Sequence, residues 1–292
     1  MKLIILTIFL VSNLLATVDI SLSHNNIKHG TTFAVILQSD SKLKKAPNVI
    51  YKNITYQMFT ISGDTKQYEV FIPVDYHSKL QKENVQIKYI LNDKVIKKNF
   101  PINIVDGKYR QNEIIKVPKS KVTLSKVNKT RSNKEYNKVY KNVYSVITPQ
   151  NISKDSIFQM PMDSKITSAY GNARIYNGKT KSYHSGTDFR AKVGTSIYSA
   201  NDGIVKLTMD RFYLGLVVYI DHGRGAYTYY CHMDRIDVVE GQTIKKGQSI
   251  GTSGKTGRIT GPHLHYAVRL YNTTVDPLQY GSLYNQIIRK YH

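Results

Sequence analysis

Side chains that bind metal ions and transfer protons are concentrated between residues 184 and 265. They are His184, Asp188, Cys231, His232, His263 and His265. Zinc favours imidazole and carboxylate ligands, and a catalytic zinc site keeps one coordination position open for water. These residue types therefore predict a hydrolytic zinc site.

The spacing within this set limits the path of the chain. His263 and His265 are two residues apart. On a strand both would face one wall of a cleft, where one could bind metal and the other handle protons. His184 and Asp188 are four residues apart, roughly 13 Å on a straight strand, which is too far for one ion. The chain must therefore bend between them, and we expect the φ freedom of Gly186 to allow the bend.

Ordered motifs extend over residues 160–280. They are Ser168-Ala169-Tyr170-Gly171 with Arg174, His184-x-Gly-x-Asp188, Asp221-His222-Gly223, Tyr230-Cys231-His232-Met233, and Thr256-Gly257-Arg258 followed by Gly261-Pro262-His263-Leu264-His265. Together they resemble the zinc metallopeptidase domains of the M23 (LytM, lysostaphin-type) family. The resemblance implies a compact antiparallel β domain over residues 160–282, with its site in a groove.

The resemblance also implies a role for each residue of the site. His184, Asp188 and His265 are expected to bind one Zn²⁺ per peptidase domain. His232 and His263 are expected to be the unligated catalytic pair, and which of them is the general base stays open.

The function that the resemblance implies is a zinc-dependent peptidoglycan hydrolase that cleaves peptide cross-links in cell-wall remodelling and cell-shape control. A D,D-endopeptidase is expected, and D,D-carboxypeptidase action stays open beside it. The alternative is a latent or noncatalytic LytM module that regulates another wall hydrolase.

The sequence also predicts whether other residues near the motifs line the substrate groove or are buried. Tyr176, Tyr183 and Arg174 are candidates for the substrate groove, although tyrosine is also common in β-rich cores. Cys231 is the only cysteine, so it can form no intramolecular disulfide. Because neighbours on a strand face opposite sides, we expect Cys231 to be a buried thiol and not a nucleophile beside His232.

The first sixteen residues predict export. After Met1-Lys2, an apolar run over residues 3–15 is shorter than the roughly 20 residues that cross a bilayer. With Ala16 as a cleavage position, residues 1–16 read as a signal peptide of a periplasmic protein. Cleavage after Ala16 would place the bulky Leu14 at the minus-three position, where small residues are usual. An uncleaved segment that associates the protein with the membrane is therefore the alternative.

Residues 17–106 predict a second, smaller β domain, so that the chain as a whole is mainly β. Short β-prone segments are separated by turn residues. They cover residues 33–37, 54–59, 68–73, 85–91 and 95–105. This pattern is typical of an immunoglobulin-like β-sandwich, which also precedes the peptidase in several envelope enzymes of the family.

Residues 107–159 predict a basic linker with an amphipathic helix, and residues 283–292 a C-terminal tail. Five apolar and aromatic residues of the linker follow helical spacing: Tyr136, Val139, Tyr140, Val143 and Tyr144. Such a helix could pack on one domain or cover the active-site groove.

Charge narrows the range of partners. The chain has a net charge of +22, which attracts polyanions. In an exported protein the expected partners are peptidoglycan and anionic envelope surfaces, the latter contacted through the linker. Nucleic acid is not expected, because the sequence contains no recognition motif for it. The oligomeric state is not indicated.

Overall fold

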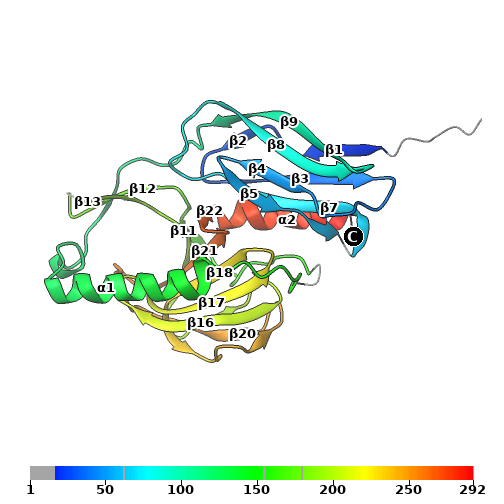
Figure 1. Ribbon diagram of the computed structural model, residues 1–292. Coiled ribbons are helices and arrows are strands. Elements are labelled where there is room, and N and C mark those ends of the chain that lie inside the picture. Colours follow the sequence, from blue (N-terminus) through cyan, green and yellow to red (C-terminus); the bar gives the residue numbers. More distant parts are fainter. Residues whose placement is uncertain (1–16, 62, 154–155, 179, 292) are drawn as a thin grey trace, which may run out of the picture.

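The computed structural model describes residues 17–61, 63–153, 156–178 and 180–291, so the predicted signal peptide lies outside the described residues. The chain is mainly β, as the sequence predicts. Figure 1 shows two β-rich units, with helix α2 (Pro277–Tyr291) lying between them and helix α1 (Lys126–Val139) beside the second unit. No helix in the described part combines the length and the apolar character needed to span a bilayer.

The first unit is a two-sheet β-sandwich. One sheet has the order β1-β3-β7-β6 and the other the order β2-β9-β8-β4-β5. The strands are β1 (Val18–Leu22), β2 (Asn26–Lys28), β3 (Thr32–Ser39), β4 (Asn48–Tyr51), β5 (Ile54–Gln57), β6 (Phe59–Ile61), β7 (Asp64–Pro73), β8 (Lys82–Leu91) and β9 (Lys94–Val105).

Alternation along the strands builds the core of this sandwich. In β8, the side chains of Val85, Ile87 and Tyr89 are buried while their neighbours are at least partly exposed, as expected for a strand with one face covered. They join Phe33 and Val70 of the other sheet in one apolar cluster. The predicted β domain is therefore present, and its immunoglobulin-type topology stays a prediction.

The second unit contains a ten-stranded sheet with the order β11-β14-β21-β18-β17-β16-β19, onto which β15, β20 and β22 are paired. Its strands are β11 (Ile166–Ser168), β14 (Thr187–Arg190), β15 (Ser196–Tyr198), β16 (Gly203–Arg211), β17 (Gly215–Gly223), β18 (Ala226–Ile236), β19 (Thr243–Ile244), β20 (Ser249–Ser253), β21 (His263–Leu270) and β22 (Thr273–Val275). The pairs β14–β21 and β18–β21 are antiparallel, so residues from three separate segments meet at one place in the sheet.

A small three-stranded sheet joins the linker to this unit. Strand β10 (Glu113–Ile115) lies in the linker and pairs in parallel with β12 (Ala173–Tyr176), which forms a hairpin with β13 (Thr180–Tyr183). The hairpin leads directly to His184. The linker is therefore ordered here and forms part of the surroundings of the site.

The linker helix packs on the outer face of the large sheet. Ser125 caps α1 by accepting a hydrogen bond from the backbone N–H of Asn128, a common stabilising end for a helix. After a short 3₁₀ turn (Lys119–Lys121) and α1, a π-helical turn (Tyr140–Tyr144) ends the segment. The predicted stripe is only partly buried: Val139, Val143 and Tyr144 join the core cluster, whereas Tyr136 and Tyr140 are 48% and 44% exposed.

The π-helical turn explains this difference. A π turn holds more residues than an α turn, so positions before and after Val139 no longer share one straight face. Of the two placements that the sequence leaves open for the helix, packing on a domain is the one observed, because no residue of α1 lines the pocket described below.

Helix α2 connects the two units. The sequence predicts a tail over residues 283–292, but the structure places these residues, as far as Tyr291, in α2. Leu283 and Ile287 pack against Ala34 and Ile36 of the sandwich. Tyr284 and Ile288 pack on the opposite side, in the core of the second unit. Spacing by four residues gives the helix two apolar faces. Both faces are buried between the units, so the described residues 283–291 belong to α2 and do not form a tail.

Candidate active site

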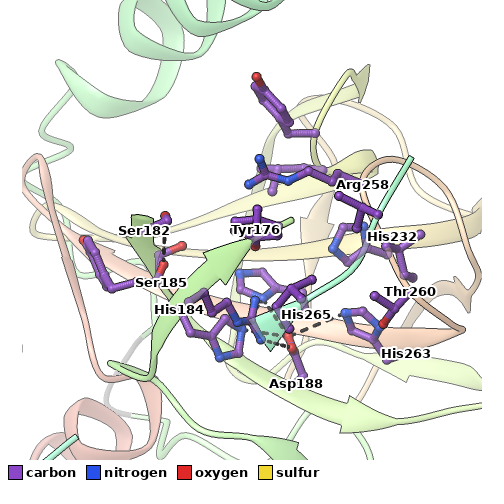
Figure 2. Close-up of a pocket in the computed structure, with 17 residues that line it drawn as sticks. Tyr176, Ser182, His184, Ser185, Asp188, His232, Arg258, Thr260, His263 and His265 are labelled. Atoms are coloured by element: carbon purple, nitrogen blue, oxygen red, sulfur yellow. Dashed lines mark hydrogen bonds and ion pairs between the residues drawn. The ribbon is translucent and has the colours of Figure 1, made fainter. Parts of the chain in front are cut away.

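Three buried side chains converge on one point beside strands β14 and β21 of the large sheet (Figure 2). His184 follows β13, Asp188 lies on β14, and His265 lies on β21 directly opposite Asp188 in the strand register. Oδ1 of Asp188 is 2.9 Å from Nε2 of His184 and 2.8 Å from Nδ1 of His265, and the two nitrogens are 3.0 Å apart.

This triangle fits a metal ion. Ligand atoms around a tetrahedral ion with bonds of about 2.0–2.2 Å lie about 3.3–3.6 Å apart, only slightly farther than the atoms observed. The two imidazole nitrogens and the carboxylate oxygen each direct a lone pair at the same point, and a single proton cannot hydrogen-bond all three. The group His184, Asp188 and His265 is the one set of at least three such side chains that could hold a metal ion in the described part of the chain.

The ionisation states of these residues suit ligands. Burial alone would raise the pKa of Asp188, but the charges and hydrogen bonds of His184 and His265 outweigh it and hold that pKa well below its usual range. Burial lowers the pKa of His265 to about 4, although Asp188 opposes the shift. A carboxylate anion beside a neutral imidazole is the combination that binds a divalent cation.

Neighbouring backbone and side chains orient the two ends of this site. The Nδ1 of His184 lies 2.8 Å from the carbonyl oxygen of Ala169. Since a carbonyl only accepts, Nδ1 carries the proton and Nε2 presents its lone pair to the centre. On the other side, Nη2 of Arg174 donates to Oδ2 of Asp188 at 2.8 Å. Each of these two residues thus has one atom held and one atom left for a metal.

Gly186 is required for a reason that the sequence does not reveal. We expected its φ freedom to bend the chain, but its φ lies outside the left-handed region. Instead, a Cβ at Gly186 would lie 2.5 Å from the carbonyl oxygen of Tyr266 and 2.7 Å from Nε2 of His265. Glycine therefore allows the chain between His184 and Asp188 to pass close to His265.

His232 and His263 face each other beside the triangle, with ring centroids 4.9 Å apart. The Nδ1 of His232 donates to the carbonyl oxygen of Thr256 at 2.8 Å, and that of His263 to the carbonyl oxygen of Gly261 at 2.9 Å. When neutral, each ring therefore keeps Nε2 as an acceptor. Nε2 of His263 is 3.6 Å from Oδ1 of Asp188.

Backbone strain and burial distinguish His232. It has φ +60° at a bulge of β18, where the pairing with β17 shifts. A left-handed conformation is uncommon outside glycine and often accompanies a functional site. Burial lowers the pKa of His232 to about 3, assisted by the charges of His263 and His265. The ring is thus neutral at neutral pH, and its Nε2 keeps a free lone pair.

The neighbouring Cys231 takes no part in this arrangement. Its side chain is fully buried in the cluster beneath the linker helix, and burial raises the pKa of the thiol well above its usual range. His222 is likewise buried, with Nδ1 donating to the carbonyl oxygen of Asp202 and Nε2 accepting from Thr228. Both residues are structural, and for Cys231 this is what the sequence predicts.

A pocket of about 160 Å³ opens above the converging side chains, and Tyr176, Tyr183 and Arg174 all line it. Their surroundings differ. Tyr183 stacks on Tyr76 of the sandwich with ring centroids 4.0 Å apart. Arg174 is occupied by ion pairs with Asp188 and Glu113, so its side chain positions the site and is not free for a ligand. Tyr176 covers one face of Arg258.

Sequence reasoning missed several further residues of the pocket wall. Among them are Ile115 and Val117 of the linker, Tyr213 and Arg258. Arg258 lies within a motif that the sequence singles out, but only the fold shows that its side chain turns toward the pocket. For the other three the sequence contains no signal, because nothing in their own segments indicates that these segments approach the site.

Comparison with known proteins identifies the fold family of this site. Residues 182–277 match the sequence pattern of peptidase family M23. The chain contains an M23 metallopeptidase domain. The match begins just before His184 and includes every residue of the converging set and both unligated histidines.

The relatives of this M23 domain are similar over the same part of the chain. The peptidoglycan DD-endopeptidase ShyA of Vibrio cholerae is 41% identical over 122 residues, which cover 41% of this chain and 28% of ShyA. The DD-carboxypeptidase/endopeptidase Mpg of Neisseria meningitidis is 34% identical over 115 residues, 39% of this chain and 26% of Mpg. The match thus spans little more than a quarter of either relative.

One solved structure resembles nearly the whole chain. A Pseudomonas aeruginosa protein assigned to peptidase M23 covers 89% of this chain, and 96% of its own length is matched, with a TM-score of 0.63 at 22% identity. This likeness extends beyond the M23 domain and shows that the arrangement of the other β unit and the linker recurs in a second protein. At this identity it concerns the fold alone.

Proposed function

We propose that this protein is a zinc-dependent peptidoglycan hydrolase that cleaves peptide cross-links as a D,D-endopeptidase, with D,D-carboxypeptidase action on stem peptides as a secondary activity. The observation that carries the proposal is the convergence of His184 Nε2, Asp188 Oδ1 and His265 Nδ1, with the acceptor nitrogens of His232 and His263 beside them. Three metal ligands next to unligated bases are the composition of a hydrolytic metal site.

Zinc is the metal proposed, because two imidazoles and one carboxylate are the ligands that it takes in catalytic sites. His184, Asp188 and His265 would hold it. When bound, the metal would polarise the scissile carbonyl and make a nearby water more acidic. Arg174 keeps Asp188 in place through Oδ2, so that Oδ1 stays directed at the two imidazole nitrogens.

His232 and His263 would move the protons. Each has its Nδ1–H committed to a backbone carbonyl, so proton uptake and release can occur only at Nε2. The ring that accepts the proton of the attacking water becomes an imidazolium, which can then donate this proton to the leaving amine. The other ring would hydrogen-bond the substrate. Burial of His232 keeps it neutral beforehand.

The choice of substrate is supported by the relatives. ShyA is named for DD-endopeptidase activity on peptidoglycan, and Mpg for DD-carboxypeptidase and endopeptidase activity. Both share the M23 segment with this chain. We propose the same substrate class here, and with it a role in cell-wall remodelling and cell shape.

We further propose that the protein is exported to the periplasm and contacts anionic envelope surfaces through its linker. The exposed lysines of α1 and the turn after it support this proposal: Lys126, Lys129, Lys134, Lys138 and Lys141. Glu135, the one acidic residue of α1, is buried and paired with Arg131. A cationic segment of this kind binds anionic polymers and head groups.

The decisive test is digestion of intact peptidoglycan by the zinc-loaded chain lacking residues 1–16, followed by mass analysis of the muropeptides. Loss of cross-linked dimers is expected with the wild type and not with His184→Ala. Shortening of monomeric stems alone would assign carboxypeptidase action instead. Unchanged muropeptides in both samples would contradict the proposal.

A further inference from the structure

The side chain of Arg258 lies between two tyrosine rings at the wall of the pocket. Its Cζ is 4.0 Å from the ring centroid of Tyr176 and 4.5 Å from that of Tyr213. The backbone N–H of Arg258 also donates to the carbonyl oxygen of Tyr213 at 2.9 Å. Figure 2 shows Arg258 beside Tyr176 and above His232, on the side of the pocket away from Asp188. Arg258 and the proton-transfer pair His232 and His263 therefore line the same pocket.

The charge of Arg258 has no protein partner in the described part of the chain. Among the charged side chains that line the pocket, Arg174 and Asp188 pair with each other at 2.8 Å, and Arg174 also pairs with Glu113. The guanidinium of Arg258 makes neither an ion pair nor a hydrogen bond to any described residue, although the residue is only partly exposed. The pocket thus has one fixed positive charge that is available to a ligand.

The stacking determines what kind of ligand fits. Rings that attract a guanidinium cover its two faces, whereas its N–H groups point outward in its plane. With the faces covered, Arg258 can interact only through its edge, and its orientation is fixed before a ligand arrives. A planar fork of N–H donors matches a carboxylate, which it binds through two parallel hydrogen bonds.

We propose that Arg258 binds a carboxylate of the peptide substrate and thereby selects peptides that carry one close to the scissile bond. This inference rests on the proposed function, and it names the feature of the substrate that the pocket recognises. Two sources supply this chemistry in a cross-linked peptide: the α-carboxylate at a chain end, and a carboxylate on the side chain of a diamino acid. Arg258 lines the same pocket as His232 and His263, so the carboxylate that it binds belongs to the peptide that occupies this pocket.

The test compares synthetic cross-linked peptides with the zinc-loaded protein. In the first peptide both carboxylates are free. In the second the terminal carboxylate is replaced by a carboxamide, and in the third the side-chain carboxylate is replaced by a carboxamide. Each is assayed with the wild type, Arg258→Met, Arg258→Lys and Lys255→Met. Lys255 is an exposed cation of the same loop that does not line the pocket, so its variant controls for net charge. Bound zinc and melting temperature are measured for every variant.

The wild type is expected to have kcat/KM about 10- to 100-fold higher for the peptide with the recognised carboxylate than for its carboxamide, the range of a charge-assisted hydrogen bond. Arg258→Met should remove this preference by lowering the value for the carboxylate form alone, Arg258→Lys should keep part of it, and Lys255→Met should keep all of it. The carboxamide peptide that is cleaved more slowly by the wild type identifies which of the two carboxylates Arg258 binds. An equal loss for all peptides in Arg258→Met, or no preference in the wild type, would overturn the proposal.

If the wild type cleaves none of these peptides, the proposed function fails, and calorimetric titration of the same peptides then tests Arg258 separately. Tighter binding of the carboxylate form that is lost in Arg258→Met would uphold the subsite. Equal binding of carboxylate and carboxamide forms would refute it.

Discussion

Nη2 of Arg174 lies 2.8 Å from Oδ2 of Asp188, and Nε of the same guanidinium lies 3.0 Å from Oε2 of Glu113. Asp188 belongs to the M23 domain, whereas Glu113 lies on β10 of the linker, directly opposite Arg174 in the strand register. All three side chains are at most 19% exposed. The linker therefore contributes an anion, Glu113, that positions Arg174. Arg174 in turn positions Asp188, a proposed metal ligand.

Loss of this support should weaken metal binding. Arg174→Gln is expected to lower zinc affinity about 10- to 100-fold, as loss of a partner that orients a ligand commonly does. Glu113→Gln should lower it in the same direction by less, because Arg174 then loses one of its two anions. Competition with a chromophoric chelator measures both. Glu83→Gln, the same change in the sandwich, is the control, and an equal effect there would show that the site is not involved.

The two sets of histidines should separate metal binding from turnover. His184→Ala is expected to lose zinc and activity together, because it removes one of the three converging ligands. His232→Ala should keep its zinc while its turnover falls about 10²- to 10⁴-fold, the usual contribution of a general acid or base. Zinc content by mass spectrometry and kcat on a cross-linked peptide test this prediction. An active His232→Ala would contradict the assignment.

A methyl group at Gly186 should disturb the site directly. Gly186→Ala places a Cβ against Tyr266 and His265, and overpacking of this kind costs about 1–3 kcal/mol. We expect lower zinc affinity and a lower melting temperature. At Gly261, a Cβ meets nothing within 4 Å and φ is not in the left-handed region, so Gly261→Ala should change neither quantity. Similar effects in both variants would indicate general backbone sensitivity.

The burial of His222 should make stability depend on pH. Burial lowers the pKa of His222 below its ordinary value of 6.5, so the unfolded chain binds a proton at a higher pH than the folded chain does. The stabilising contribution is therefore fully present above pH 6.5 and decreases as the pH falls from there toward the folded-state pKa. The free energy of unfolding should fall less steeply below pH 6.5 in His222→Gln than in the wild type. Equal slopes would show that His222 titrates alike in both states.

Short motifs made much of this site predictable. Strand geometry relates positions two residues apart, so His263 and His265 are expected on one face. The four-residue spacing of His184 and Asp188 predicts a bend, because a straight strand would hold them too far apart for one ion. The alternation in β8 predicts a half-buried strand by the same reasoning. The fold then confirms that these segments meet.

Contacts between distant segments could not be predicted. Glu113 and Arg174 are 61 residues apart, and nothing in either segment indicates that they pair. Arg258 lies between rings from two other segments, and the need for glycine at position 186 comes from His265 across the sheet. The sequence does not predict α2 over residues 283–291 for a related reason. Its two apolar faces pack on two different units, and the helix sequence does not indicate where these units lie.

Removal and return of the metal tests most directly whether the converging side chains form a hydrolytic zinc site. The purified chain would be stripped with a chelator, dialysed, and assayed on cross-linked muropeptides during titration with Zn²⁺. We predict no cleavage by the stripped protein, full recovery at one equivalent of zinc, and no recovery in His184→Ala. Cleavage that persists in the stripped protein, or recovery in the variant equal to that of the wild type, would contradict the assignment of the site.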